Sequence, residues 1–141
     1  MKRTILILML VFASTNFVCN SQQEKKAAQF ADTYAHSLSA VHASIDTAHA
    51  NGKISETDYQ AILRDLLTAN QGGLDLNVTI RGIANGTNNK SQLNPIVQGI
   101  ELALIDGTAH IKDPNTAAEV QAAVSAINLV LTSIEQIYGG Q

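Results

Sequence analysis

The amino-acid sequence predicts an all-α fold, in which four or five helices form a small bundle after an N-terminal signal segment. Two long stretches repeat apolar residues at alternating intervals of four and three, which is the spacing of helices that pack side by side. Residues that cap helices stand at the ends of these stretches. The chain has 141 residues, 45% of them hydrophobic and 15% charged, so it has the length of one domain and enough apolar side chains for a core.

The N-terminal residues have the order of a secretory signal. Lys2 and Arg3 give a positive start, residues 5–12 are all apolar, and small or polar residues follow from Ala13. Polar residues interrupt the run soon afterwards, so it is shorter than the ~20 apolar residues that span a bilayer. We therefore expect an export signal over residues 1–21 and a helical-bundle domain over residues 22–141, without a membrane-spanning segment in that domain.

The single cysteine of the chain, Cys19, directly follows the signal and is succeeded by the polar residues 20–23. In these residues the N-terminus resembles the signal of bacterial lipoproteins. The resemblance covers about the first twenty residues, with Asn16 and Val18 where such signals usually have leucine and a small residue. It implies cleavage before Cys19, lipid on the Cys19 sulfur and a domain tethered to a membrane of the cell envelope.

Two other cleavage sites stay open. An ordinary signal peptidase would find small residues at Cys19 and Ser21 and cut after Ser21, which removes the thiol and gives a secreted protein. A cut after Thr15 would leave Cys19 unpaired in an oxidising compartment, where a free thiol is reactive. We favour the lipid anchor, because it gives the lone cysteine a use.

The first two predicted helices form a hairpin. The first ends at Asn51 and Gly52, since glycine commonly follows a helix C-terminus. Ser55, with Asp58 three residues later, is typical of a helix N-terminus. The stripe of the first helix is Ala27, Ala31, Tyr34, Leu38, Val41, Ile45 and Ala48, and that of the second is Tyr59, Ile62, Leu63 and Leu66.

The middle of the chain is ambiguous over residues 74–83. Leu74, Leu76, Val78 and Ile80 alternate with polar residues as in a strand, whereas Gly73, Leu76, Ile80 and Ile83 have helical spacing. We choose the helix, because a single strand would find no partner in a helical chain. After a polar turn at residues 85–91, Ser91 or Asn94 is expected to cap a helix that opens with Pro95 and closes at Gly107. Its apolar positions are Ile96, Ile100, Ala103 and Leu104.

The last helix is predicted to begin near Pro114 and to end at Gly139 and Gly140. Its stripe is Val120, Val124, Ile127, Leu131, Ile134 and Tyr138. Further apolar residues flank the stripe, namely Ala123, Val130 and Ile137, and such a wide face favours a bundle over a two-stranded coiled coil. The central core is therefore predicted to contain Leu38, Val41, Ile45, Ile127, Leu131 and Ile134.

Two groups of residues suggest metal chemistry. His42, Asp46 and His49 share one helical face at intervals of four and three, so either histidine could hold a metal with Asp46. Residues 47–58 have the skeleton of a calcium-binding loop, but Thr47 and His49 stand where carboxylates are needed. We prefer the interpretation that the histidines lie at the boundary of the core and that the loop residues cap helices, so no metal site and no cofactor is expected.

Composition and motifs leave two classes of function. The net charge of −3 and the absence of Trp argue against a nucleic-acid partner, and no nucleophile or phosphate-loop motif indicates an enzyme. The first class is an exported, non-catalytic bundle that acts by surface contact with an unknown protein partner. The alternative is a carrier that binds a small ligand between its helices, or a metal at His42, Asp46 and His49.

Overall fold

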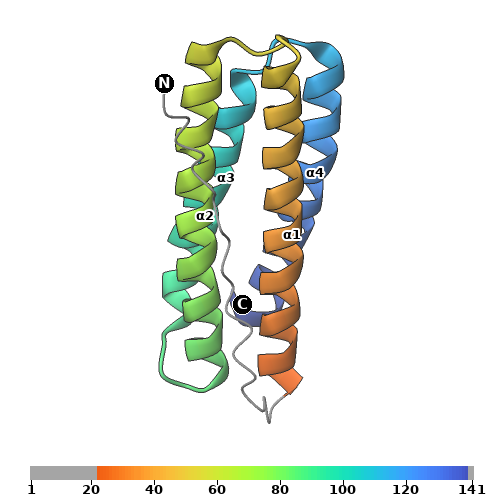
Figure 1. Ribbon diagram of the computed structural model, residues 1–141. Coiled ribbons are helices and arrows are strands. Elements are labelled where there is room, and N and C mark those ends of the chain that lie inside the picture. Colours follow the sequence, from red (N-terminus) through yellow and green to blue (C-terminus); the bar gives the residue numbers. More distant parts are fainter. Residues whose placement is uncertain (1–21, 140–141) are drawn as a thin grey trace, which may run out of the picture.

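A computed structural model describes residues 22–139, and over this range the fold is an all-α bundle of four packed helices (Figure 1). The long helices are α1 (Gln22–Ala50), α2 (Glu56–Ala84), α3 (Leu93–Ala109) and α4 (Pro114–Ile134). Two short elements complete the fold, a 3-10 turn at Lys90–Gln92 and a π-helical turn at Glu135–Gly139. The predicted signal and Cys19 lie outside the described residues. The all-α prediction is confirmed.

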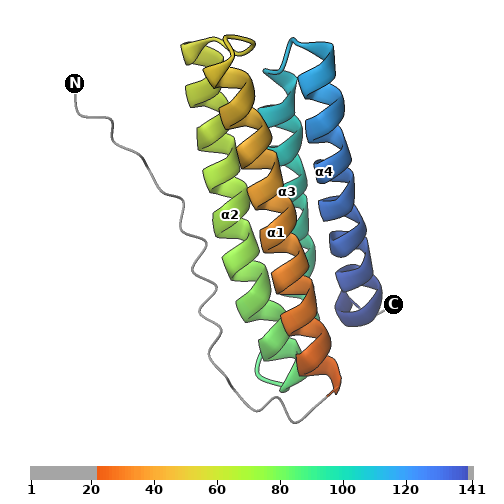
Figure 2. The ribbon, with the colours of Figure 1, turned by 45° about the vertical axis from the view of Figure 1, so that its right-hand side comes forward.

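The helices run alternately up and down, so each is antiparallel to the next along the chain (Figures 1 and 2). Helix α1 packs against both α2 and α4, and α2 makes its closest packing with α3. Short loops join α1 to α2 and α3 to α4 at one end of the bundle, and a longer turn joins α2 to α3 at the other end. This arrangement is the four-helix bundle that wide apolar faces favour.

The core lies between the helices and consists of the predicted stripes. Leu38, Val41 and Ile45 of α1 are 1% exposed, and Ile127 and Leu131 of α4 are fully buried. Ile134 is buried as well. The six core predictions are therefore confirmed, because the 4-3 spacing keeps one face of each helix directed at its neighbours.

A buried tyrosine joins α1 to α2 in the middle of the bundle. The Tyr34 hydroxyl donates a hydrogen bond of 2.6 Å to the carbonyl oxygen of Ala69, and the side chain is 2% exposed. Its ring lies against Gly73, where an added Cβ would stand 2.3 Å from the Tyr34 Cε1 atom. The close approach of these helices at Tyr34 therefore requires glycine at position 73.

The ambiguous residues 74–83 are part of α2, which runs without interruption to Ala84. Leu76 and Ile80 are buried, whereas Leu74 and Val78 are 37% and 66% exposed. The helical choice is confirmed, and it reduces the expected four or five helices to four. The strand-like alternation arose because apolar residues also stand on the outer face of α2.

Helix starts agree with prediction at two places and differ at a third. Ser55 accepts a hydrogen bond from the Asp58 amide, and Asp113 caps α4 before Pro114. The prediction that Ser91 or Asn94 caps α3 is wrong: the N-cap is Gln92, and its side chain makes no capping bond. The 3-10 turn at Lys90–Gln92 leads directly into α3, so the helix already begins at Leu93, before the proline.

One predicted helix end shifts, and the last predicted helix changes from α to π geometry before its predicted end. Helix α3 continues past Gly107 to Ala109, and α4 ends at Ile134, where the π-helical turn continues the chain to Gly139. Among the described helices, Pro114–Gly139 is long and apolar enough to cross a membrane by composition, contrary to our expectation for the domain. Its stripe is buried within the bundle, and core helices commonly meet the same criterion.

Candidate functional site

The three residues of the predicted metal face do not gather around one point. The His42 Nδ1 atom lies 3.5 Å from Asp46 Oδ2, but His49 extends from α1 toward α2, where its Nε2 atom lies 3.0 Å from Glu56 Oε2. Among residues 22–139, no group of three His, Cys, Asp or Glu side chains could hold a metal ion. The geometry leaves at most the pair His42 and Asp46 from the predicted set.

Tyr59 of α2 contacts two of these side chains, Asp46 and His49, and holds them in place. Its hydroxyl donates a 2.7 Å hydrogen bond to Asp46 Oδ1, and its ring stacks on His49 with centroids 4.0 Å apart. Burial, with the hydrogen bond to Asp46 and the nearby carboxylates, raises the pKa of Tyr59 to about 12. The group therefore fastens α1 to α2, as expected for residues at the boundary of the core.

Ionic contacts tie the two loops at one end of the bundle. Asp58 Oδ2 accepts a hydrogen bond from Ser55 Oγ and another, of 3.0 Å, from Lys112 Nζ, while His110 Nδ1 lies 3.8 Å from its other oxygen. The bond from Ser55, followed by that from Lys112, holds the pKa of Asp58 below its ordinary value. The Ser55 hydroxyl donates to the Asp58 carboxylate, so this bond fixes both side chains at the start of α2.

The loop that resembled a calcium site is a pair of helix caps. Gly52 has a φ of 72°, which is the left-handed conformation common after a helix. The Gly52 amide donates a hydrogen bond to the His49 carbonyl, and the Lys53 amide donates one to the Ala48 carbonyl. Asp58 is engaged with Ser55 and Lys112, so the residues of this loop serve the hairpin.

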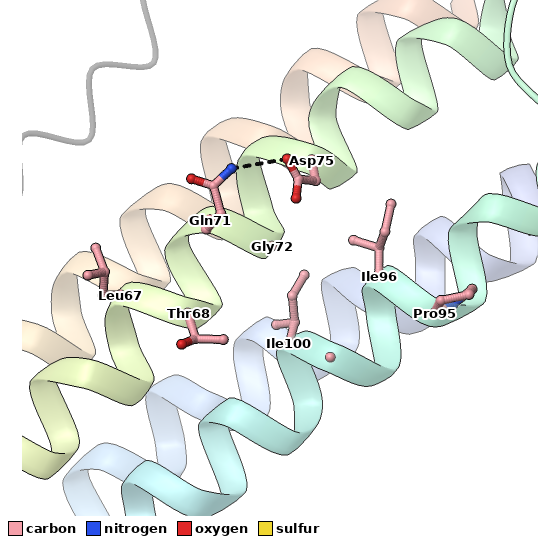
Figure 3. Close-up of a pocket in the computed structure, with 9 residues that line it drawn as sticks. Leu67, Thr68, Gln71, Gly72, Asp75, Pro95, Ile96 and Ile100 are labelled. Carbon is pink, nitrogen blue, oxygen red and sulfur yellow. Dashed lines mark hydrogen bonds between the residues drawn. The ribbon is translucent and has the colours of Figure 1, made fainter.

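A groove of about 650 Å³ lies between α2 and α3 (Figure 3). Ile96 and Ile100 of α3 point toward α2, and Ile100 packs against Gly72. The lining residues are Leu67, Thr68, Gln71, Gly72, Asp75, Pro95, Ile96, Gly99 and Ile100. This volume falls in the range of about 300 to 1,000 Å³ that is usual for small-molecule sites.

Two glycines shape the groove in different ways. At Gly72 an added Cβ would stand 2.6 Å from Ile100 Cγ1, so glycine lets the isoleucine pack against α2. At Gly99 nothing lies within 4 Å of such an atom. Among the described glycines, Gly99 alone combines a helical backbone with open space, and neither turn geometry nor close packing accounts for it. Because Gly99 has no side chain, the groove stays open on the α3 side at this position.

The polar part of the groove is small and acidic. Gln71 Nε2 donates a hydrogen bond of 3.1 Å to Asp75 Oδ1 (Figure 3). Asp75 is the single ionisable side chain among the described lining residues, and over residues 22–139 it forms no ion pair. Its charge is therefore uncompensated by the protein, unlike those of Asp58 and Asp113, which lie beside lysines.

The spacing of residues in the sequence does not predict this groove. Its residues come from two helices, and their proximity depends on how those helices pack. A signal was nevertheless present in α2, because Leu67, Gln71, Leu74 and Val78 repeat at intervals of four, three and four on its outer face. This second stripe lies beside the buried one and leaves Leu67, Leu74 and Val78 exposed on the outer face of α2.

Fold and site together define a four-helix bundle with one apolar groove on its α2–α3 face. No family model matches the chain, and neither a curated protein nor a solved structure matches it.

Proposed function

We propose that the chain is an exported, non-catalytic helical bundle that acts by surface contact and is tethered to a membrane of the cell envelope through lipid on Cys19. The N-terminal sequence supports the export and the tether. The groove between α2 and α3, with its exposed apolar border, is the observation that supports the contact. If processing removes Cys19 instead, the same domain acts as a secreted protein.

Exposed aliphatic side chains lie on both helices that form the groove, and Leu67 is one of the residues that line it. Leu67 is 49% exposed and Val78 is 66% exposed on α2, and Leu102 is 59% exposed on α3. Scattered apolar residues are normal on protein surfaces, but an aligned stripe beside a groove is typical of a contact surface. We infer that a protein partner covers this face.

The tether can be tested by fractionating cells that express the full chain. A cysteine with two or three acyl chains is held stably, because a single chain gives only marginal membrane binding. We expect the mature protein in the membrane fraction and a change to precursor or soluble product with Cys19→Ser. A mature chain that begins at Gln22, without lipid and in the soluble fraction, would refute the tether.

The contact can be tested separately by placing a photo-crosslinking amino acid at Val78 in the living cell. Leu129 of α4 is the matched control, because it is also an exposed aliphatic side chain, at 70%. We expect a crosslinked product of defined mass from position 78 and none from position 129. Equal crosslinking from both positions would contradict a contact through the α2–α3 face.

The second candidate function is a small-ligand carrier, and the same groove favours it. Its volume suits a small molecule, and its walls are mainly apolar with few polar groups, as in most ligand sites. The metal version of this function has less support, since His49 pairs with Glu56.

A further inference from the structure

The groove between α2 and α3 has a shape and a charge that together select a class of ligand. Gly99 leaves it open, Gly72 lets Ile100 pack against α2, and Ile96 and Ile100 provide apolar walls. An apolar body can therefore enter between the helices and remove these side chains from water. A ligand without such a body would gain little from this site.

Charge distinguishes among the apolar ligands. Asp75 stands at the border of the groove with one oxygen bonded to Gln71 and no cation beside it among the described residues. Within residues 22–139 no lysine or arginine lines the groove, and the whole chain has a net charge of −3. A carboxylate ligand such as a fatty acid would be repelled, whereas a cation would compensate Asp75.

We propose that the α2–α3 groove binds a small organic cation with an apolar body, such as an aryl-alkyl amine, whose ammonium group lies at Asp75. The inference rests on the second proposed function, that of a ligand carrier. Gly99 supports it independently of Asp75, because alanine at this exposed helical position would meet no other atom, yet the position holds glycine. An open wall is what an entering ligand requires.

The test uses three probes that share one apolar body. These are 4-phenylbutylammonium, 4-phenylbutanol and 4-phenylbutyrate, titrated at neutral pH into the purified processed protein labelled with ¹⁵N and followed by NMR. We expect saturable shifts at Gly72 and Gly99, with the cation bound about two- to fivefold more tightly than the alcohol, the range for an exposed ion pair. The anion should bind most weakly, and added salt should reduce the differences.

Three variants locate the effect. Asp75→Asn should make the cation and the alcohol bind equally, because only the charge is removed. Gly99→Leu should abolish saturable binding of all three probes, since its side chain occupies the groove, while circular dichroism confirms an intact helical fold. Leu129→Ala removes an exposed aliphatic residue from α4 and should leave all three affinities unchanged.

Several results would overturn the proposal. Anion binding as tight as cation binding would refute the charge argument, and binding that survives Gly99→Leu would place the probes elsewhere. A wild-type dimer that becomes monomeric with Gly99→Leu would show that a second copy covers the groove. If no probe binds saturably, the ligand class is wrong, while fractionation and crosslinking still decide the tether and the protein contact on their own readouts.

Discussion

Replacing Gly73 by alanine should destabilise the protein although alanine is the better helix former. An added Cβ would stand 2.3 Å from Tyr34 Cε1 and 3.0 Å from two other ring atoms. The ring cannot turn aside easily, because Tyr34 is 2% exposed and its hydroxyl is bonded to the Ala69 carbonyl. Either α1 and α2 move apart or the ring leaves its hydrogen bond.

The magnitude follows from three terms. Glycine to alanine in a helix interior gains about 1 kcal/mol, and overpacking of a core costs about 1 to 3 kcal/mol. A displaced Tyr34 hydroxyl loses about 1 kcal/mol more. We therefore expect Gly73→Ala to lower the free energy of unfolding by about 1 to 3 kcal/mol. Gly99→Ala is the matched control, because its Cβ meets open space, and it should raise stability by about 0.5 to 1 kcal/mol.

The two variants are compared by urea denaturation and thermal melting, both followed by circular dichroism. For a chain of this length a change of 1 kcal/mol moves the melting temperature by about 4 °C. In a Tyr34→Leu background the ring is absent, so Gly73→Ala should become neutral or stabilising. The reasoning fails if Gly73→Ala is as stable as the wild type, or if its cost is unchanged without the ring.

Three other outcomes are expected. Leu131→Ala should cost about 2 to 5 kcal/mol by urea denaturation, because the side chain is fully buried, and a cost below about 1 kcal/mol would contradict its place in the core. Burial raises the pKa of Tyr34, and that of Tyr59 to about 12, above the unfolded value near 10. The stabilisation that the two neutral tyrosines give to the folded state is therefore complete below pH 10 and is lost as pH rises toward 12. A urea unfolding midpoint that stays constant over this pH range would refute this expectation. Replacing His42 and His49 together by alanine should leave zinc retention unchanged in elemental analysis. Loss of stoichiometric zinc in this variant would support the alternative hypothesis of a metal carrier.

The helices could be predicted because their signals are local and repeated. The 4-3 stripe of α1 and that of α4 each extend over six or seven positions, so single exceptions do not obscure them. Ser55 and Asp113 cap helices with their own side chains, and such bonds reach only three residues along the chain. The start of α3 was missed because a 3-10 turn, and not a side-chain cap, precedes it.

The contacts at the ends and on the faces of the bundle could not be predicted from spacing. Lys112 meets Asp58 across 54 positions of the chain, and such a pair depends on which loops meet at one end. His49 and Asp46 share a face of α1, yet each was taken up by a residue of α2, Glu56 and Tyr59 respectively. Spacing shows which residues share a helical face, but the side chains of the neighbouring helix determine which contacts they make.

Gly99 shows how a local cost can point to a site that spacing does not reveal. Glycine in a helix interior costs about 1 kcal/mol relative to alanine, and at Gly73 that cost permits the packing of Tyr34 against α2. At Gly99 no contact in the described structure offsets it, since an added Cβ would meet nothing within 4 Å. Departures from local preference without structural compensation are expected where function requires them. The position lies in the wall of the α2–α3 groove, so Gly99→Ala links the two properties: if the groove binds its ligand through this opening, the variant that gains stability should bind the cationic probe more weakly.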